Sequence, residues 1–400
     1  MNHNFYKMLE LEAREFGSCY PPLCMDMCPK EEITARTAQG QVHLLEVTPK
    51  GKKMVKCHAW TVACPTDQPR QLRPFRILYE TLHHLLLEVP KRLDTDFNLQ
   101  MWDSSIVPHR RKLPIMYDFL DDRLTAMRHD MMKQRIPTEK LVLLLEPMIR
   151  FYLCFGYRLC TRPRDEFDLE QNKKVFTDCL QWCLNCCDVQ YKKDTGHMEP
   201  AIKKHNSKQE LKFDVQLIES LNIIFNLGDN APLHRYMRLP EFVRKSTPVK
   251  LAYDIAMANI MGNFVRVIEL GKKLCPLTFY ALIWQLPKIQ RRGLKDLSHG
   301  FSQHEAISGL KVQDWLYFGN YEDVKRTCAF YGLQLYQKCG VIFNEKRFNE
   351  DVQDAPFYYF PTQIDTLPVK MVLTYQASFK GYDKVEYEWI RYSDVYSIIE

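Results

Sequence analysis

The sequence predicts a mainly α-helical protein, in which a TPR-like α-solenoid of helical pairs is followed by a C-terminal winged helix. Between about residues 72 and 275, amphipathic segments of helical length follow one another, with apolar residues three and four positions apart. Strand patterns are scarce in this part. After residue 276, the predicted order of a helix, a short strand, two short helices and a hairpin is that of a winged helix.

The helical array is expected to begin at Arg73-Pro74, because proline is well tolerated in the first turn of a helix. Apolar residues at helical spacing follow from Ile77 to Val89, and Pro90 ends the segment. Further helices are expected at about residues 113–134, 138–159, 172–191, 208–227, 249–261 and 263–274. No strict repeat length is visible, so any repeat is degenerate.

The C-terminal module is expected to contain a helix at 277–286, an extended stretch at 307–309 and two short helices at 310–318 and 321–331. Alternating segments at 333–336 and 341–343 then predict a hairpin around Lys338-Cys339-Gly340. The predicted domains are therefore an irregular N-terminal segment (1–71), the helical repeats (72–275), the winged helix (276–348) and an aromatic-rich extension (349–400). Within the N-terminal segment, one helix over Glu31–Glu46 is expected.

The composition is that of a globular protein, with 46% apolar and 26% charged residues among 400. A net charge of +6 permits an RNA-binding surface without requiring one. The N-terminal residues contain no apolar signal-peptide core, and no apolar stretch is long enough for a membrane span, so no membrane association is expected. Fourteen cysteines without any Asn-x-Ser/Thr acceptor favour free thiols in a reducing compartment.

The cysteines allow one metal hypothesis. A possible set of zinc ligands comprises Cys24, Cys28, Cys57 and Cys64, with His58 nearby. The loose spacing of these cysteines favours buried thiols instead. A second group lies along one helix face and is expected to be part of the core, because four sulfurs on a straight helix cannot surround one ion. This group comprises Cys179, Cys183, Cys186 and Cys187.

The sequence contains none of the common nucleotide-binding or hydrolase motifs. Asp121 and Asp122 are adjacent, and on a helix their side chains point about 100° apart, which disfavours paired acid–base chemistry. We therefore expect a protein that is not an enzyme and that needs no cofactor or metal.

Basic residues gather at Lys50–Lys56, at His109–Lys112, and at Lys288, Arg291, Arg292 and Lys295. In a winged helix, the second helix of the pair and the wing commonly contact nucleic acid. Glu322 and Asp323 at the start of that helix would repel phosphate, although they also suit the helix dipole. The candidate nucleic-acid contacts are Lys325, Arg326, Lys338, Lys346 and Arg347.

Two further arginines, Arg123 and Arg128, flank the apolar stripe of the helix predicted at 113–134. Arginines in such positions extend their stems over the core and reach acidic groups on neighbouring elements. Interhelical ion pairing is favoured over ligand binding for both.

Several motifs in order resemble the Sac/GANP family, named for germinal-centre-associated nuclear protein. Met27-Cys28-Pro29-Lys30-Glu31-Glu32, Arg36 and Leu44-Leu45-Glu46 resemble its opening block. The second block of the family resembles Leu72-Arg73-Pro74 with Thr81-Leu82. The later blocks resemble, in order, Asp118-Phe119, Asp122-Arg123, Arg128 and Asp130, and finally Phe225–Gly228. The chain departs from the family at Thr125, where a second arginine is usual, and at Thr37, where glutamate is usual. The motif residues expected to be structural are Cys28, Pro29, Glu32, Arg36, Arg73, Pro74, Asp122, Arg123, Arg128 and Asp130.

The resemblance implies helical repeats plus a PCI-type winged helix, and a non-catalytic scaffold like that of the transcription-coupled mRNA-export complex. Implied partners are other PCI or winged-helix proteins, small acidic subunits and RNA. The implied location is the nucleus. Short members of the family suggest an alternative role in centrosome duplication and at the spindle, with the cytoplasm, centrosome or spindle as location. A winged-helix nucleic-acid-binding module is the other alternative.

Overall fold

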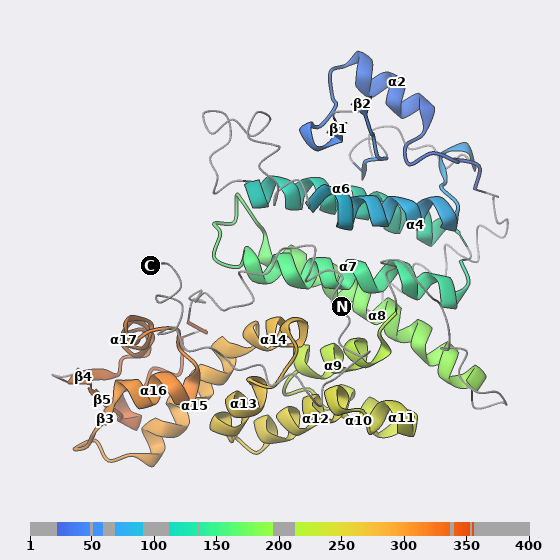
Figure 1. The fold of residues 1–400 in the computed structure, drawn as a ribbon. Helices are drawn as coiled ribbons and strands as arrows, with labels where there is room; N and C mark the ends of the chain where they lie inside the picture. The colour runs from blue at the N-terminus through green and yellow to red at the C-terminus, as the bar shows by residue number, and fades with distance from the viewer. Residues whose placement is uncertain are drawn as a thin grey trace, which may run out of the picture. The chain divides into compact units, whose positions relative to one another are not determined.

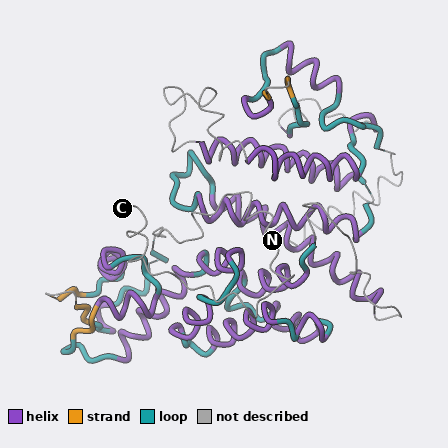
Figure 2. Tube along the Cα trace, viewed as in Figure 1, coloured by secondary structure: helices purple, strands orange, loops and turns teal. Residues whose placement is uncertain are grey.

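The computed structural model describes residues 22–48, 51–58, 69–90, 112–134, 136–194, 213–336, 340–352 and 354–355. This part of the chain is mainly helical, as the sequence predicts, and its few strands are short (Figures 1 and 2). It divides into two compact units. The first comprises residues 1–151 and 176–213, and the second comprises residues 152–175 and 214–400. Among the described residues, no helix combines the length and the apolar character needed to cross a bilayer.

The first unit is built on long helices. Its elements are α2 (Lys30–Ala38), η1 (Leu44–Glu46), β1 (Val47–Thr48), β2 (Gly51–Lys52), η2 (Pro69–Gln71), α4 (Phe75–His83), the π turn η3 (His84–Glu88), α6 (Lys112–Lys133), and parts of α7 (Thr138–Arg158) and α8 (Leu169–Asp194). The predicted helices at 113–134 and 138–159 are confirmed to within a residue at each end.

Aromatic and sulfur contacts join these helices. The rings of Tyr117 on α6 and Phe151 on α7 stack with centroids 5.6 Å apart. Lys140 at the start of α7 lies over the ring of Phe75 on α4 at 5.3 Å. The face of α8 that carries four thiols is buried, which confirms the expectation that Cys179, Cys183, Cys186 and Cys187 belong to the core.

The N-terminal segment is more regular than predicted, and the expectation of one helix over 31–46 is wrong. Helix α2 ends at Ala38, and Gly40 takes a positive φ of 67°, which reverses the chain. The chain then forms η1 and a short antiparallel pair in which Val47 faces Lys52. Thr34 and Gly40 weaken the helix, but the reversal at Gly40 is what ends it.

The second unit continues the helical array with α9 (Val215–Phe225), α10 (Ala231–Arg238), α11 (Glu241–Arg244), α12 (Thr247–Ile260), α13 (Phe264–Gly271), α14 (Pro276–Ile283) and α15 (Leu286–Gly300). Helix α9 packs on α12 and α14, and α12 packs on α13. Asp214 caps α9 through the Leu217 amide at 3.1 Å, and Asn263 caps α13 through the Arg266 amide at 3.0 Å. Helices α10, α11 and α15 were not predicted.

A small helix-and-sheet module ends the described chain. It contains β3 (Ala306–Ser308), α16 (Gly309–Leu316), α17 (Tyr321–Phe330), β4 (Gln334–Tyr336), β5 (Gly340–Ile342) and η6 (Glu345–Arg347). The sheet is antiparallel in the order β3-β5-β4, with Val341 paired to Ile307 on one side and Leu335 on the other. The predicted hairpin is therefore confirmed.

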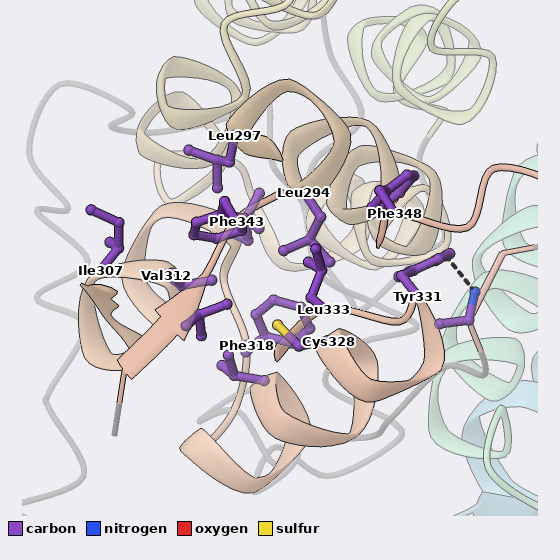
Figure 3. Packing of buried hydrophobic residues seen from close by; sticks show 14 residues of the cluster. Leu294, Leu297, Ile307, Val312, Phe318, Cys328, Tyr331, Leu333, Phe343 and Phe348 are labelled. Atoms are coloured by element: carbon purple, nitrogen blue, oxygen red, sulfur yellow. Dashed lines mark hydrogen bonds between the residues drawn. The ribbon is translucent and has the colours of Figure 1, made fainter. Parts of the chain in front are cut away.

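One apolar cluster holds this module together (Figure 3). Leu294 and Leu297 from α15 meet Val312, Cys328, Val341 and Phe343 from the module, all of them buried. Tyr331 closes the cluster, because it stacks on Phe348 at 5.2 Å and its hydroxyl accepts a hydrogen bond from the Ala355 amide at 2.8 Å (Figure 3). Ala355 thus extends the core past the predicted boundary at residue 348.

Gly156 marks a tight crossing in the second unit. A Cβ atom there would overlap Asn172 Oδ1 and Trp284 Cζ2. We expect Gly156→Ala to lower the free energy of unfolding by about 1–3 kcal/mol, since an overpacked core must shift its backbone. Gly300→Ala is the control, because a Cβ there meets nothing within 4 Å. Equal urea midpoints for the two variants would contradict the prediction that the backbone at Gly156 has no room for a side chain.

Candidate functional site

The carboxylate of Glu46 is the centre of a buried network in the first unit. Glu46 is 0% exposed and accepts hydrogen bonds from the guanidinium groups of Arg36 and Arg123, the latter at 3.3 Å. It also accepts from the backbone amides of Val55 and His43, each at 3.1 Å. Four donors from α2, the residues around the β1–β2 hairpin and α6 therefore converge on one side chain. We call these contacts the Glu46 network.

Arg36 extends this network along α2. Its guanidinium bonds to Glu32 Oε1 and to the carbonyl oxygen of Val55, each at 3.2 Å. Glu32 in turn accepts from the Cys57 amide at 3.0 Å. Burial, assisted by the nearby Glu32 charge, raises the pKa of Cys28 far above its ordinary value. Cys28 is thus a protonated, buried thiol.

On α6, Arg123 is held from two further directions. Its guanidinium lies 4.3 Å over the ring of Phe119, and that ring stacks on His43 at 4.6 Å. Asp122 accepts from Arg123 Nη1 and from the His58 amide, both at 3.0 Å. Burial, assisted by the Arg123 charge, lowers the pKa of His43 to about 4. His43 is therefore neutral at physiological pH, and its Nδ1 accepts from the Leu45 amide at 3.2 Å.

A second cluster, the Asp130 network, lies at the other end of α6. Asp130 is fully buried and receives Lys56 Nζ at 2.7 Å and Arg73 Nε at 2.6 Å. Arg73, itself 0% exposed, also donates to the carbonyl of Met27 at 3.2 Å, and Lys56 donates to the carbonyl of Gln71 at 3.0 Å. The two networks fasten the described N-terminal residues onto α6.

The remaining motif residues have local roles. Arg128 donates to Thr125 Oγ1 at 2.9 Å, so the threonine that departs from the family pattern still makes a polar contact. Pro29 and Pro74 directly precede α2 and α4, where their carbonyls accept the first helical hydrogen bonds. Nine of the ten motif residues therefore build the N-terminal part of the first unit, while Arg128 faces Thr125 and Cys179.

This arrangement has the chemistry of a structural core. The pKa of Glu46 is held below its ordinary value, so this carboxylate stays ionised and is unsuited to proton transfer at neutral pH. The expectation of ion pairing is supported for Arg123, and its acidic partner Glu46 lies in the short 3-10 helix η1 and not on a neighbouring α-helix. Within the described ranges, no group of three or more His, Cys, Asp and Glu residues has the arrangement of a metal site. Cys64, one member of the zinc hypothesis, lies outside those ranges.

Sequence reasoning missed two members of these networks. Lys56 belongs to the basic cluster at Lys50–Lys56 in the sequence, but its side chain is only 4% exposed and pairs with Asp130. Glu46 was noticed only as part of a family motif. No local signal marks Glu46 for burial, because its charged partners Arg36 and Arg123 lie 10 and 77 residues away in the sequence.

The candidate nucleic-acid residues fall on two elements of the C-terminal module. Lys325 and Arg326 lie on α17 and pair with acids one turn earlier, Lys325 with Glu322 at 2.5 Å and Arg326 with Asp323 at 3.9 Å. Glu322 has its pKa lowered, chiefly by the hydrogen bond from Lys325. Lys346 and Arg347 are exposed on η6, which packs against α15, and Lys338 lies outside the described residues.

The basic residues on α15 are Lys288, Arg291, Arg292 and Lys295, and most of them contact other groups of the same chain. Arg291 donates to the Glu350 carbonyl at 2.6 Å and approaches Asp354 at 3.5 Å. Lys295 pairs with the Glu350 carboxylate at 2.8 Å. Arg292 caps the end of α12 by donating to the Asn259 carbonyl at 2.7 Å. The acidic residues after η6 thus neutralise Arg291 and Lys295, two of the four cations, and Lys288 is exposed.

Comparison with known proteins agrees with the motif residues. The model of the SAC3/GANP family matches residues 27–337, which include both buried networks and all of α6 to α17. The chain belongs to the SAC3/GANP family. The match begins at Met27, whose carbonyl receives Arg73, and it ends beside the β4–β5 hairpin.

Two curated members of the SAC3/GANP family are similar at low identity. SAC3 family protein B of Arabidopsis thaliana is 23% identical over 338 residues, which are 82% of this chain and 18% of that protein. Protein xmas of Drosophila melanogaster is 23% identical over 367 residues, which are 87% of this chain and 16% of that protein. This chain therefore spans less than a fifth of the length of either relative.

Proposed function

We propose that this SAC3/GANP family member is a non-catalytic scaffold subunit, of the kind that supports mRNA export. The observation that carries the proposal is the extent of the family match, which spans residues 27–337 and so covers the helices up to α17 and strand β4 of the module that follows them. In this proposal, α9 to α13 are part of an α-solenoid, and residues 276–348, with α14 to α17 and β3 to β5, are a PCI-type winged-helix domain. Such folds present extended surfaces for other macromolecules.

The proposed partners are other PCI or winged-helix proteins, small acidic subunits and RNA, and the proposed location is the nucleus. The test is co-expression of the full chain with a candidate PCI-domain protein, followed by size-exclusion chromatography. The proposal expects a complex of fixed stoichiometry that survives moderate salt. The proposal is contradicted if every PCI-domain protein of one proteome, tested in turn, elutes as a peak separate from this chain. A centrosomal or spindle location of the tagged protein favours the alternative role suggested by the short family members.

A nucleic-acid-binding role is the second candidate, and it is favoured by the exposed cations Lys346 and Arg347 on η6 beside the hairpin. We expect the Lys346→Glu/Arg347→Glu variant to bind an oligouridylate more weakly at low salt. The slope of log affinity against log salt should fall by about 1.4, since each lost phosphate contact on a single strand is worth about 0.7.

The control for this prediction is Lys174→Glu/Lys311→Glu, which reverses two exposed lysines elsewhere on the chain. Filter binding across a salt series gives both slopes. An unchanged slope in the η6 variant would remove η6 from the nucleic-acid interface, and an equal loss in the control would reveal only a general charge effect.

A further inference from the structure

Two large apolar side chains lie exposed where α10 meets α11. Met237 is 55% exposed and Phe242 is 54% exposed, and only four residues separate them in the chain. Neighbouring exposed apolar residues of this size on a folded surface are typical of an interaction site. With the cations Arg238, Arg244 and Lys245 they form what we call the α10–α11 patch.

The backbone beneath this patch is firmly held. Tyr236 stacks on Tyr253 of α12 with ring centroids 4.2 Å apart, and its hydroxyl donates to the Arg244 carbonyl at 3.4 Å. Arg235 makes a two-pronged contact with the buried carboxylate of Glu219, at 2.8 and 2.9 Å. Leu239 is buried between the two helices. The exposed side chains therefore project from a rigid base, which lowers the entropy that a partner must overcome on binding.

The two ends of the patch are also tied to each other. Arg244 Nη1 donates to the carbonyl of Met237 at 3.4 Å, so the end of α11 lies against the end of α10. Figure 1 shows α10 and α11 as neighbours beside α12. Met237 and Phe242 thus belong to one continuous surface.

The surroundings of the patch are strongly basic. Residues 230–250 contain five Lys or Arg residues and one Glu, a net charge of +4. Arg235 is neutralised by Glu219, and Lys245 pairs with Glu241 at 2.5 Å. Arg238 and Lys250 are exposed. A partner that covers Met237 and Phe242 must therefore bring negative charge with its apolar groups.

We propose that the α10–α11 patch binds an acidic peptide segment of a partner protein, with a bulky apolar side chain seated on Met237 and Phe242. Methionine adapts to varied apolar partners but cannot stack flat on a nucleobase. Glu241 lies between Arg238 and Lys245 in the chain, where it would repel a phosphate backbone. A peptide can place its carboxylates beside the cations and avoid Glu241, so the patch fits a peptide better than RNA.

This inference rests on the proposed scaffold function, since it gives a chemistry to one partner. The first experiment selects binders from a displayed library of short random peptides on the full chain. Enriched sequences should contain two or more Asp or Glu residues around a Leu, Phe or Trp. Basic or neutral consensus sequences, or no enrichment, would overturn the proposal.

The second experiment measures the best enriched peptide by fluorescence anisotropy. Met237→Ser/Phe242→Ser should weaken binding by about tenfold or more, and Arg238→Glu/Lys245→Glu should do the same. Leu310→Ser is the matched control, because Leu310 is 63% exposed on α16, and it should leave binding unchanged. Unfolding midpoints of all three variants check that each surface change leaves the fold intact.

Two comparisons separate the possible outcomes. If oligouridylate binding is lost in the patch variants while no acidic peptide binds, the patch is an RNA surface and the inference is wrong. If Met237→Ser/Phe242→Ser still binds the selected peptide, the site lies elsewhere and the inference is also wrong. In either case, a complex with a PCI-domain partner that survives in the same variant leaves the proposed scaffold function standing.

Discussion

Replacing Asp130 with alanine is expected to lower the free energy of unfolding by about 3–5 kcal/mol. Lys56 and Arg73 both depend on this carboxylate, at 2.7 and 2.6 Å, and both are buried. Removing the acid leaves two cations inside the protein with only carbonyl oxygens for partners. The cost of an unpaired buried charge far exceeds the value of the pair itself.

Urea unfolding followed by circular dichroism measures this loss. Lys56→Met should cost less than Asp130→Ala, because the pair between Arg73 and Asp130 remains. Glu80→Ala serves as the surface control. The Glu80 side chain is 48% exposed, and its ion-pair partner Arg76 is 83% exposed. Removing this ion pair should therefore cost less than about 1 kcal/mol of folding free energy. A similar small loss in Asp130→Ala would show that water reaches the Asp130 network.

Replacing Glu46 with glutamine should produce a loss of about 3 kcal/mol or more at neutral pH, because Arg36 and Arg123 lose their shared counter-charge. Burial alone would raise the pKa of Glu46. The Arg123 charge, the Val55 amide and Arg36 together outweigh it and hold the pKa below its ordinary value. The ionised carboxylate is therefore more stable in the folded chain than in the unfolded one.

The pH dependence follows from that lowered pKa. The contribution of Glu46 is fully present above its unfolded value, about 4.3, and is lost as the pH falls through the lower folded value. The stability gap between the wild type and Glu46→Gln should thus be widest near neutral pH and should shrink below about pH 4.3. Urea midpoints measured across an acidic series test this. A gap that stays constant into acid would mean that the charge of Glu46 is not what stabilises the network.

Long periodic helices were the most predictable part of this protein. The range 113–134 became α6 and 138–159 became α7, because many apolar positions repeat along each. Helix α15 was missed, since Lys288, Arg291 and Arg292 dilute an apolar stripe that rests on only a few residues. Helices α10 and α11 were missed because they are short, with Pro232 in the first turn of α10 and Pro240 directly before α11. Helices of this length depend on packing against their neighbours.

The motif positions could be found from sequence, but their partners could not. Arg123 was expected to form an ion pair, yet its acid lies 77 residues earlier, in a turn whose position depends on the reversal at Gly40. Lys56 looked like one more surface lysine, because nothing local marks it for burial beside Asp130, 74 residues away. Local pairs were within reach, and Lys325 with Glu322 is an example of the i,i+3 spacing.

The long separation between Lys56 and Asp130 also has a consequence for how the chain is made. Lys56 leaves the ribosome 74 residues before Asp130 does, which at about 5–20 residues per second is a delay of roughly 4 to 15 seconds. Until then, Lys56 and Arg73 are hydrated cations on a nascent chain beside polyanionic ribosomal RNA. The N-terminal segment can reach its final packing only after synthesis of α6, so folding of the first unit is completed from its middle outward.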